Sequence, residues 1–175
     1  MEKRPLSVTM FFLLSLFVIA IALNFQSALA GELKMIRGQT VYVPVYSHII
    51  IGERERGSVN FDLSINLSIR NTDPKNPITI ISADYYDSNG EVVKKFVTKP
   101  MTIKPMASTY YFIAQSDKSG GWGANYIVKW KSEKKVNEPI IESVTYGSRG
   151  NHSISFVSQG RVISESENVP KKKGE

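Results

Sequence analysis

The sequence contains no cysteine and only two histidines among its 175 residues. The absence of cysteine excludes disulfides, thiolate metal sites and catalysis by a thiol, so the hydrophobic core must hold the fold together. A histidine metal site would need both His48 and His152, together with carboxylates from distant strands. Their spacing does not indicate a shared site, and we therefore expect neither a metal ion nor another cofactor.

A sustained helical period is also missing after the first thirty residues. The stretch from Asn60 to Arg70 alternates instead between polar and apolar side chains. Because successive side chains of a strand point to opposite faces, this alternation predicts a strand with one buried face. Asp62, Ser64 and Asn66 should face away from the core. The residues predicted to be buried are Phe61, Leu63, Ile65, Leu67 and Ile69.

Turn signals divide the rest of the chain into further short strands. The cluster Asn71–Pro74 ends the strand just described, because its side chains bond locally to the backbone and its proline has a fixed φ. Seven to nine short strands predict an immunoglobulin-like antiparallel β-sandwich. The predicted strands cover residues 40–46, 49–51, 60–70, 78–86, 91–97, 109–114, 125–131, 140–146 and 154–156. Residues 101–104, between two prolines, should form an extended connector.

Two of these strands have assignable faces. Pro44 has no N–H to give to a ladder, which places strand 40–46 at a sheet edge or beside a bulge. Tyr42 and Tyr46 should face outward on either side of this proline. The side chains expected to point inward from strands 40–46 and 78–86 are Val41, Val43, Val45, Ile81, Ala83 and Tyr85.

The segment Asp87–Glu91 lies between two predicted strands. Its Asn89-Gly90 pair predicts a hairpin, because both residues tolerate positive φ. The same segment has the oxygen ligands that open a calcium loop, but it lacks the twelve-residue length and the closing glutamate of such a loop. The hairpin turn is the stronger interpretation.

The two ends of the chain differ in composition from its middle. Lys3 and Arg4 precede an apolar run, and Ala28-Leu29-Ala30 follows it, which predicts a signal peptide over residues 1–30. An uncleaved membrane anchor over residues 6–23 is the alternative. A single sandwich domain should then occupy residues 31–163, and the polar residues 164–175 should form a disordered tail.

Several motifs resemble an uncharacterised bacterial family of exported proteins, known only as a domain of unknown function. They include Gly38–Ile49, Leu67–Asp73 and Ser119–Asn125, and the resemblance covers residues 38–163. More loosely, the chain is similar to immunoglobulin-like modules of the bacterial envelope. The resemblance implies export and the sandwich fold. It implies no activity, so it transfers no functional residue.

The loop Ser119–Asn125 is the first candidate for a binding site. Glycines flank Trp122, and exposed aromatic rings commonly anchor recognition. An excess of lysine surrounds the loop, with nine lysines against two acids between residues 94 and 135. The candidate residues of this site are Trp122, Asn125, Lys118, Lys129 and Lys131, with Tyr42 and Tyr46 as a second candidate.

These features predict an exported, non-catalytic binding or assembly module. Its partner should be an envelope protein or an anionic envelope polymer, and a membrane only if the signal segment is retained. Nucleic acid is not expected, since the basic residues are strand lysines without a stacking motif. One alternative is a hydrolase of envelope glycan that uses an acid pair such as Asp84 and Glu142, with Asp87 as a further acid. Another is a structural subunit that pairs through an edge strand.

Overall fold

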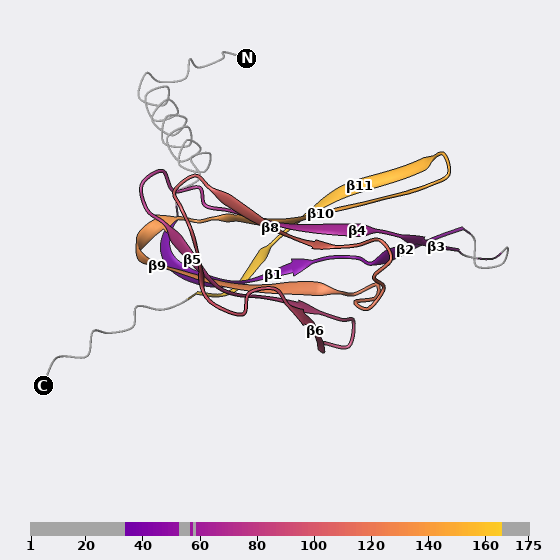
Figure 1. Cartoon of the computed structure of the whole chain (residues 1–175), viewed down its shortest axis with the longest axis horizontal. Coiled ribbons are helices and arrows are strands. Elements are labelled where there is room, and N and C mark those ends of the chain that lie inside the picture. Colours follow the sequence, from indigo (N-terminus) through magenta and orange to yellow (C-terminus); the bar gives the residue numbers. More distant parts are fainter. Residues whose placement is uncertain (1–33, 53–56, 58, 166–175) are drawn as a thin grey trace, which may run out of the picture. The chain divides into compact units, whose positions relative to one another are not determined.

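The computed structural model describes residues 34–52, 57 and 59–165, which form an all-β domain (Figure 1). The predicted signal peptide and residues 166–175 of the predicted tail lie outside these residues. No helix in the described part of the chain is long and apolar enough to span a membrane. The strands are β1 (Met35–Pro44), β2 (His48–Ile51), β3 (Val59–Asp62), β4 (Ser64–Arg70), β5 (Ile78–Tyr86), β6 (Val92–Lys95), β7 (Met101–Ile103), β8 (Ser108–Ile113), β9 (Asn125–Asn137), β10 (Ile140–Arg149), β11 (His152–Gln159) and β12 (Arg161–Glu165).

Two antiparallel sheets stack face to face and form the body of the domain (Figure 1). The larger sheet has the order β12-β1-β9-β5-β6, with β7 also paired to β5. The smaller sheet has the order β11-β10-β4-β8, and β2 and β3 form a separate two-stranded ribbon. The predicted antiparallel β-sandwich is therefore confirmed.

The strand order departs from that of an immunoglobulin domain. In the constant-type arrangement, strands A, B, E and D form one sheet and strands C, F and G the other. Here β4 pairs with β8 and β5 pairs with β9, as B pairs with E and C with F. However, β1 joins β9 and β10 joins β4, so the first and last of the corresponding strands have exchanged sheets.

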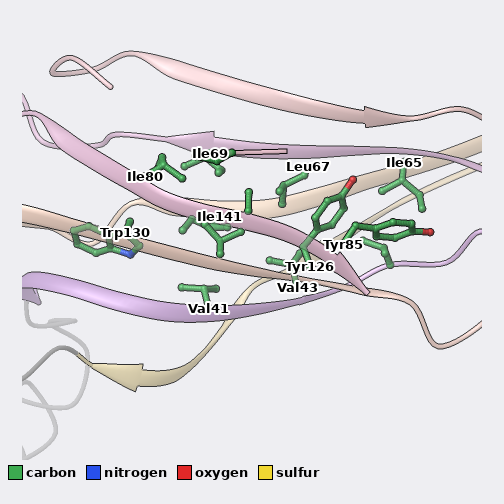
Figure 2. Close-up of a cluster of buried hydrophobic side chains, with 14 of the residues drawn as sticks. Val41, Val43, Ile65, Leu67, Ile69, Ile80, Tyr85, Tyr126, Trp130 and Ile141 are labelled. Carbon is green, nitrogen blue, oxygen red and sulfur yellow. The ribbon is translucent and has the colours of Figure 1, made fainter. Parts of the chain in front are cut away.

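The core lies between the inner faces of the two sheets. Figure 2 shows side chains from β1, β4, β5, β9 and β10 meeting there, with Trp130 at one end and the rings of Tyr85 and Tyr126 at the other. These side chains are removed from water, which is the main favourable contribution to folding. The fully buried aliphatic residues include Val43, Ile65, Leu67, Ile69, Ile80 and Val128.

The predicted burial of the alternating stretch 60–70 is confirmed for all five of its odd-numbered apolar residues. The stretch is not one strand, however. It changes partners at Leu63, so that β3 pairs with β2 whereas β4 lies between β10 and β8. Ser64 lies on the outer face of β4, as predicted, although its side chain is covered and only 6% exposed. Its register partner is Tyr146, and directly opposed residues share a face of the sheet.

A β-bulge corrects the prediction for Ile81. The register between β5 and β9 shifts between Ile80 and Ser82, so one extra residue of β5 lies opposite the neighbouring strand. Side chains before the shift point inward at even positions, and those after it point inward at odd positions. Ile78, Ile80, Ala83 and Tyr85 are therefore buried, whereas Ile81 is only partly buried.

The sequence predicts that strand 40–46 lies at a sheet edge or beside a bulge. The edge is wrong, because β12 pairs with β1 on the side opposite β9, whereas the β1–β12 register does shift between Thr40 and Val41. Pro44 is tolerated because the pairing with β12 ends at Tyr42, before the proline is reached. The inward valines Val41, Val43 and Val45 are confirmed as buried.

The polar end of the chain contains a strand that sequence analysis did not predict. Ser164 and Glu165, assigned to the tail, belong to β12 and pair with Thr40 and Gln39. The predicted connector 101–104 likewise contains the short strand β7, which pairs with β5. The domain therefore extends at least to Glu165.

A buried polar knot closes one end of the sandwich at the turn Asn71–Pro74. Asn71 donates its amide protons to the carbonyl oxygens of Asn76, Ile103 and Lys104 at 2.9, 3.3 and 3.0 Å. The Asp73 carboxylate accepts the backbone N–H groups of Lys75, Asn76 and Asn137 at 2.9, 2.8 and 3.2 Å. Two side chains thus tie the end of β4 to the segments around β7 and to the end of β9.

Replacing Ile65 with Ala should lower the free energy of unfolding by about 2–5 kcal/mol, because it leaves a cavity in a packed core. Urea unfolding measures this loss. The matched control is Ser68→Ala on the outer face of the same strand, which should change the urea midpoint much less. Equal shifts for the two variants would contradict the assigned faces of β4.

Replacing Asp73 with Asn should make the free energy of unfolding less dependent on pH in the acid range. The backbone N–H of Lys75, and then those of Asn76 and Asn137, hold the pKa of Asp73 below its usual value. The folded carboxylate binds a proton less readily than the unfolded one. Its contribution to stability is therefore present above the unfolded pKa of about 4 and is lost as the pH falls through the lower folded pKa.

Thermal unfolding measured between neutral pH and the acid range tests this dependence. Asp73→Asn should destabilise the protein at neutral pH and flatten its acid limb, whereas the exposed control Glu133→Gln should leave the acid limb unchanged. An acid limb of unchanged steepness in Asp73→Asn would assign the acid sensitivity to other carboxylates.

Candidate functional site

The glycine loop, residues 119–124, is held by hydrogen bonds from both of its sides. Ser47 donates its hydroxyl to the Gly121 carbonyl oxygen at 3.0 Å. Ser88 donates its hydroxyl to the Gly120 carbonyl oxygen at 3.0 Å and accepts the Gly123 N–H at 2.8 Å. Gly121 has a φ of +73°, which a glycine adopts without strain. The backbone of the loop is therefore fixed.

At Gly120 the backbone of the loop passes close to a buried side chain. A Cβ at this position would lie 2.0 Å from the Tyr85 hydroxyl oxygen, so only glycine fits. Tyr85 and Tyr126 lie side by side beneath the loop, with ring centroids 5.2 Å apart (Figure 2). Burial raises the pKa of Tyr85 to about 12 and also raises the pKa of Tyr126. Both hydroxyls therefore stay protonated at neutral pH, and the two side chains that support the loop carry no charge.

The ring of Trp122 belongs to an aromatic cluster formed by Tyr46, His48, Trp122 and Phe156. Trp122 meets Tyr46 edge-on at 6.0 Å and His48 at 6.2 Å between ring centroids. Tyr46 meets Phe156 of β11 at 5.6 Å. Trp122 is nevertheless 47% exposed. The cluster thus combines an accessible indole with a packed support.

A depression of about 640 Å³, which we call the polar hollow, is lined by residues that are close in sequence to those of the aromatic cluster. Lys118 forms an ion pair with Asp62 at 3.0 Å, and Asp62 is the register partner of His48 in the aromatic cluster. Arg149 donates to the Asn60 carbonyl oxygen at 3.3 Å. The hollow is lined by Val59, Asn60, Asp62, Gln115, Lys118, Ser148 and Arg149.

The structure brings together only some of the predicted site residues. Trp122, Lys118 and Tyr46 lie in or beside the aromatic cluster and the polar hollow. Asn125 begins β9 opposite Pro44, directly after the glycine loop. Lys129 lies four residues further along this strand, about 13 Å from Asn125 at the usual rise of a strand. Lys131 lies further still.

Lys129 and Lys131 therefore do not contribute to the hollow but stand on the outer face of the larger sheet. They alternate with the buried Val128 and Trp130 and are exposed. Tyr42 is on the same face, opposite Ile127 and Arg161, whereas Tyr46 follows the end of β1 and contacts Trp122 and Phe156.

The acids of the hydrolase alternative do not meet. Asp84 is on the outer face of the larger sheet, opposite Ile127 and Lys95. Glu142 is on the outer face of the smaller sheet, where it pairs with Arg70 at 3.6 Å. The hydrophobic core separates these two faces, so the two carboxylates cannot act together on one bond of a substrate.

Asp87 serves the hairpin turn, as the stronger interpretation predicted. Its carboxylate accepts the backbone N–H groups of Asn89 and Glu91, both at 2.9 Å. The bond from Glu91, more than that from Asn89, holds the pKa of Asp87 below its usual value. Gly90 has a φ of +84°.

The histidines lie in different surroundings. His48 is in the aromatic cluster and lies 3.0 Å from the Ser47 hydroxyl through Nδ1, whereas His152 begins β11 opposite Arg149. Across residues 34–52, 57 and 59–165, no three histidine, aspartate or glutamate side chains are placed to hold a metal ion.

Sequence analysis missed four residues of this region: His48, Asp62, Arg149 and Phe156. For Asp62 and Phe156, strand alternation predicts the face of the side chain but not its neighbour in another sheet. Arg149 follows a predicted strand that was assigned to end at Tyr146, three residues too early. A longer assignment of β10 would have shown a basic residue at the tip of its hairpin.

A crystal structure titled "Crystal Structure of Thermotoga maritima 1070" is similar to this chain, with 16% identity and a TM-score of 0.42 over 75% of this chain and 97% of the other. No curated protein matches this chain.

A family model described as "Protein of unknown function (DUF3124)" matches residues 38–163. The match begins within β1 and ends within β12, so it includes both sheets, the glycine loop and the polar hollow. This chain therefore belongs to the DUF3124 family of proteins of unknown function.

Proposed function

We propose that the protein is a non-catalytic binding module that recognises an anionic partner in the bacterial envelope through the aromatic cluster. The observation that carries this proposal is the exposure of Trp122, 47%, on a loop whose backbone Ser47 and Ser88 hold in place. A large exposed ring on a fixed support is typical of the few residues that dominate a binding surface.

The packing of Trp122 lowers the cost of binding. Its edge contacts with Tyr46 and His48 restrict the indole before a partner arrives. A side chain that is already ordered loses less conformational entropy on association, so more of its contact energy appears as affinity. The indole N–H can also donate a hydrogen bond to a polar partner.

Charge supports an anionic partner. The chain has a formal net charge of +6. Lys129 and Lys131 are exposed on the outer face of the larger sheet and act on a partner at long range. Arg149 lines the polar hollow, where its guanidinium can donate to a carboxylate or a phosphate at short range.

Residues 1–30 support a location outside the cytoplasm, because they combine a basic start, an apolar run and a small-residue cleavage motif.

Replacing Trp122 with Ala should weaken binding at least tenfold at every ionic strength, because the indole supplies short-range apolar contact. The protein, immobilised through its C-terminus, is exposed to an envelope extract, and the retained partner is purified and titrated. Phe112→Ala is the matched control, since Phe112 is 45% exposed but lies on β8. Equal retention by Trp122→Ala and the wild type would move the site elsewhere.

Tryptophan fluorescence gives a second measurement on the same partner. The chain has two tryptophans, of which Trp122 is exposed and Trp130 is buried. Binding should change the emission of the wild type, whereas Trp122→Phe should show no change. An unaltered wild-type spectrum at saturation would contradict contact with Trp122.

The contribution of the lysines to the binding affinity should be measurable separately from that of Trp122. Lys129→Gln combined with Lys131→Gln should weaken binding at low salt and have little effect near 1 M salt, where the Debye length is only about 3 Å. Affinity titrations of the same partner at several salt concentrations measure this difference. A loss of affinity that is independent of salt would instead mean that these lysines contact the partner directly.

Export should remove residues 1–30. Mass spectrometry of protein recovered from the envelope fraction of the source cells should identify Gly31 as the N-terminus. A species that retains Met1 and partitions with the membrane would favour the anchor over residues 6–23.

A further inference from the structure

The outermost strand of the smaller sheet, β11, has an unprotected edge. It pairs with β10 over eight consecutive residues without a register shift, and no other described strand pairs with it. Its sequence, His-Ser-Ile-Ser-Phe-Val-Ser-Gln, contains no lysine, arginine, aspartate, glutamate or proline. An edge strand presents unpaired N–H and C=O groups, and natural proteins usually block such an edge with charge, proline, a bulge or short length.

Two other edge strands in the described part of the domain carry these protections. β6 has only four residues, two of which are Lys94 and Lys95. β12 contains Arg161 and Glu165, and its pairing with β1 is interrupted by a register shift. β8, the outermost strand at the other side of the smaller sheet, also lacks charge and proline, but it has only six residues against the eight of β11.

β11 also exposes apolar side chains that its own domain does not cover. Val157 is 56% exposed and Ile154 is 37% exposed. β10 and β11 form a long hairpin that runs out from the body of the sandwich (Figure 1), so a second strand can approach this edge without meeting the larger sheet. The feature therefore combines free backbone groups, uncovered apolar surface and open access.

We propose that β11 pairs with β11 of a second copy of this chain, so that two four-stranded sheets join into one continuous antiparallel sheet. A twofold axis normal to the sheet relates the two strands, which makes the contact self-complementary. Identical strands that meet in this way repel each other if they carry charge. β11 carries no formal charge at pH 7, so it fits a second copy of itself.

The twofold axis also restricts the register. It keeps each side chain on its own face of the sheet, so opposed residues must have numbers of the same parity. Placing Ser155 opposite Ser155 sets Ile154 opposite Phe156, and the symmetry repeats this pair. Aromatic rings opposite β-branched residues are favourable cross-strand pairs. The same register sets the exposed Val157 opposite Ser153.

Phe156 links this interface to the aromatic cluster, because its ring packs against Tyr46. A dimer through β11 therefore places one cluster on each side of the twofold axis. Two sites on one rigid sheet can engage a repeating polymer together, which raises the overall affinity without a new contact in either site. The dimer itself does not depend on the proposed function.

A pair of charge variants tests the interface. Sedimentation equilibrium of the full chain should show a dimer for the wild type and a monomer for Ser155→Lys, because two lysines then oppose each other across the axis. Ser155→Glu should be a monomer for the same reason. An equimolar mixture of the two variants should restore the dimer, since lysine then faces glutamate; this recovery also shows that both variants fold.

Tyr110→Lys is the matched control. Tyr110 is 71% exposed on β8, the uncharged edge strand at the other side of the same sheet, so this variant should remain a dimer. A wild-type chain that is monomeric throughout the concentration series would overturn the proposal. A dimer that survives in Ser155→Lys, or that is lost in Tyr110→Lys, would also overturn it by assigning the contact to another surface.

Discussion

The contact between the inner faces of the two sheets is the constraint on which the rest of this structure depends. No cysteine is present, so the removal of apolar side chains from water must offset the conformational entropy of the ordered chain. β4 contributes Ile65, Leu67 and Ile69 from one sheet, and β5 and β9 contribute Ile80, Tyr126 and Val128 from the other. The polar knot around Asp73 then satisfies backbone groups where the strands end, which keeps the buried turn from weakening the core.

The same core also makes the candidate site rigid. Tyr85 and Tyr126 are core residues, yet they also form the floor beneath the glycine loop, and Gly120 is required because the Tyr85 hydroxyl occupies the space of a side chain. Burial that stabilises the fold thus also orients Trp122. A surface loop held in this way can present one large ring in one position, which is what selective binding requires.

Much of the fold could be predicted from the sequence because strand alternation is a local signal. The buried face of β4 and the inward valines of β1 follow directly from side-chain parity. The bulge at Ile81, the change of partner at Leu63 and the pairing of β12 could not be predicted in this way, because each depends on a neighbouring strand that is distant in sequence. For the same reason Trp122 could be selected as a candidate by its glycine-rich context, whereas Phe156, His48 and Arg149 joined it only through the fold. Lys129 and Lys131 show the opposite error. Their nearness in sequence to the glycine loop suggested a shared site, but β9 runs away from the loop and separates them from it.

The neighbouring positions of β1 and β12 determine how the domain responds to force. Lys34 contacts Glu165, and Gln39 pairs with Glu165 in the ladder, so the two ends of the described chain lie together. Trp122 lies beyond the other end of β1, whose ten residues span about 33 Å. Tension applied between the two ends would separate the β1–β12 ladder one pair at a time, which offers little mechanical resistance. The domain is therefore unsuited to act as a load-bearing link pulled from both ends, and its aromatic cluster lies far from the corner at which such tension would act.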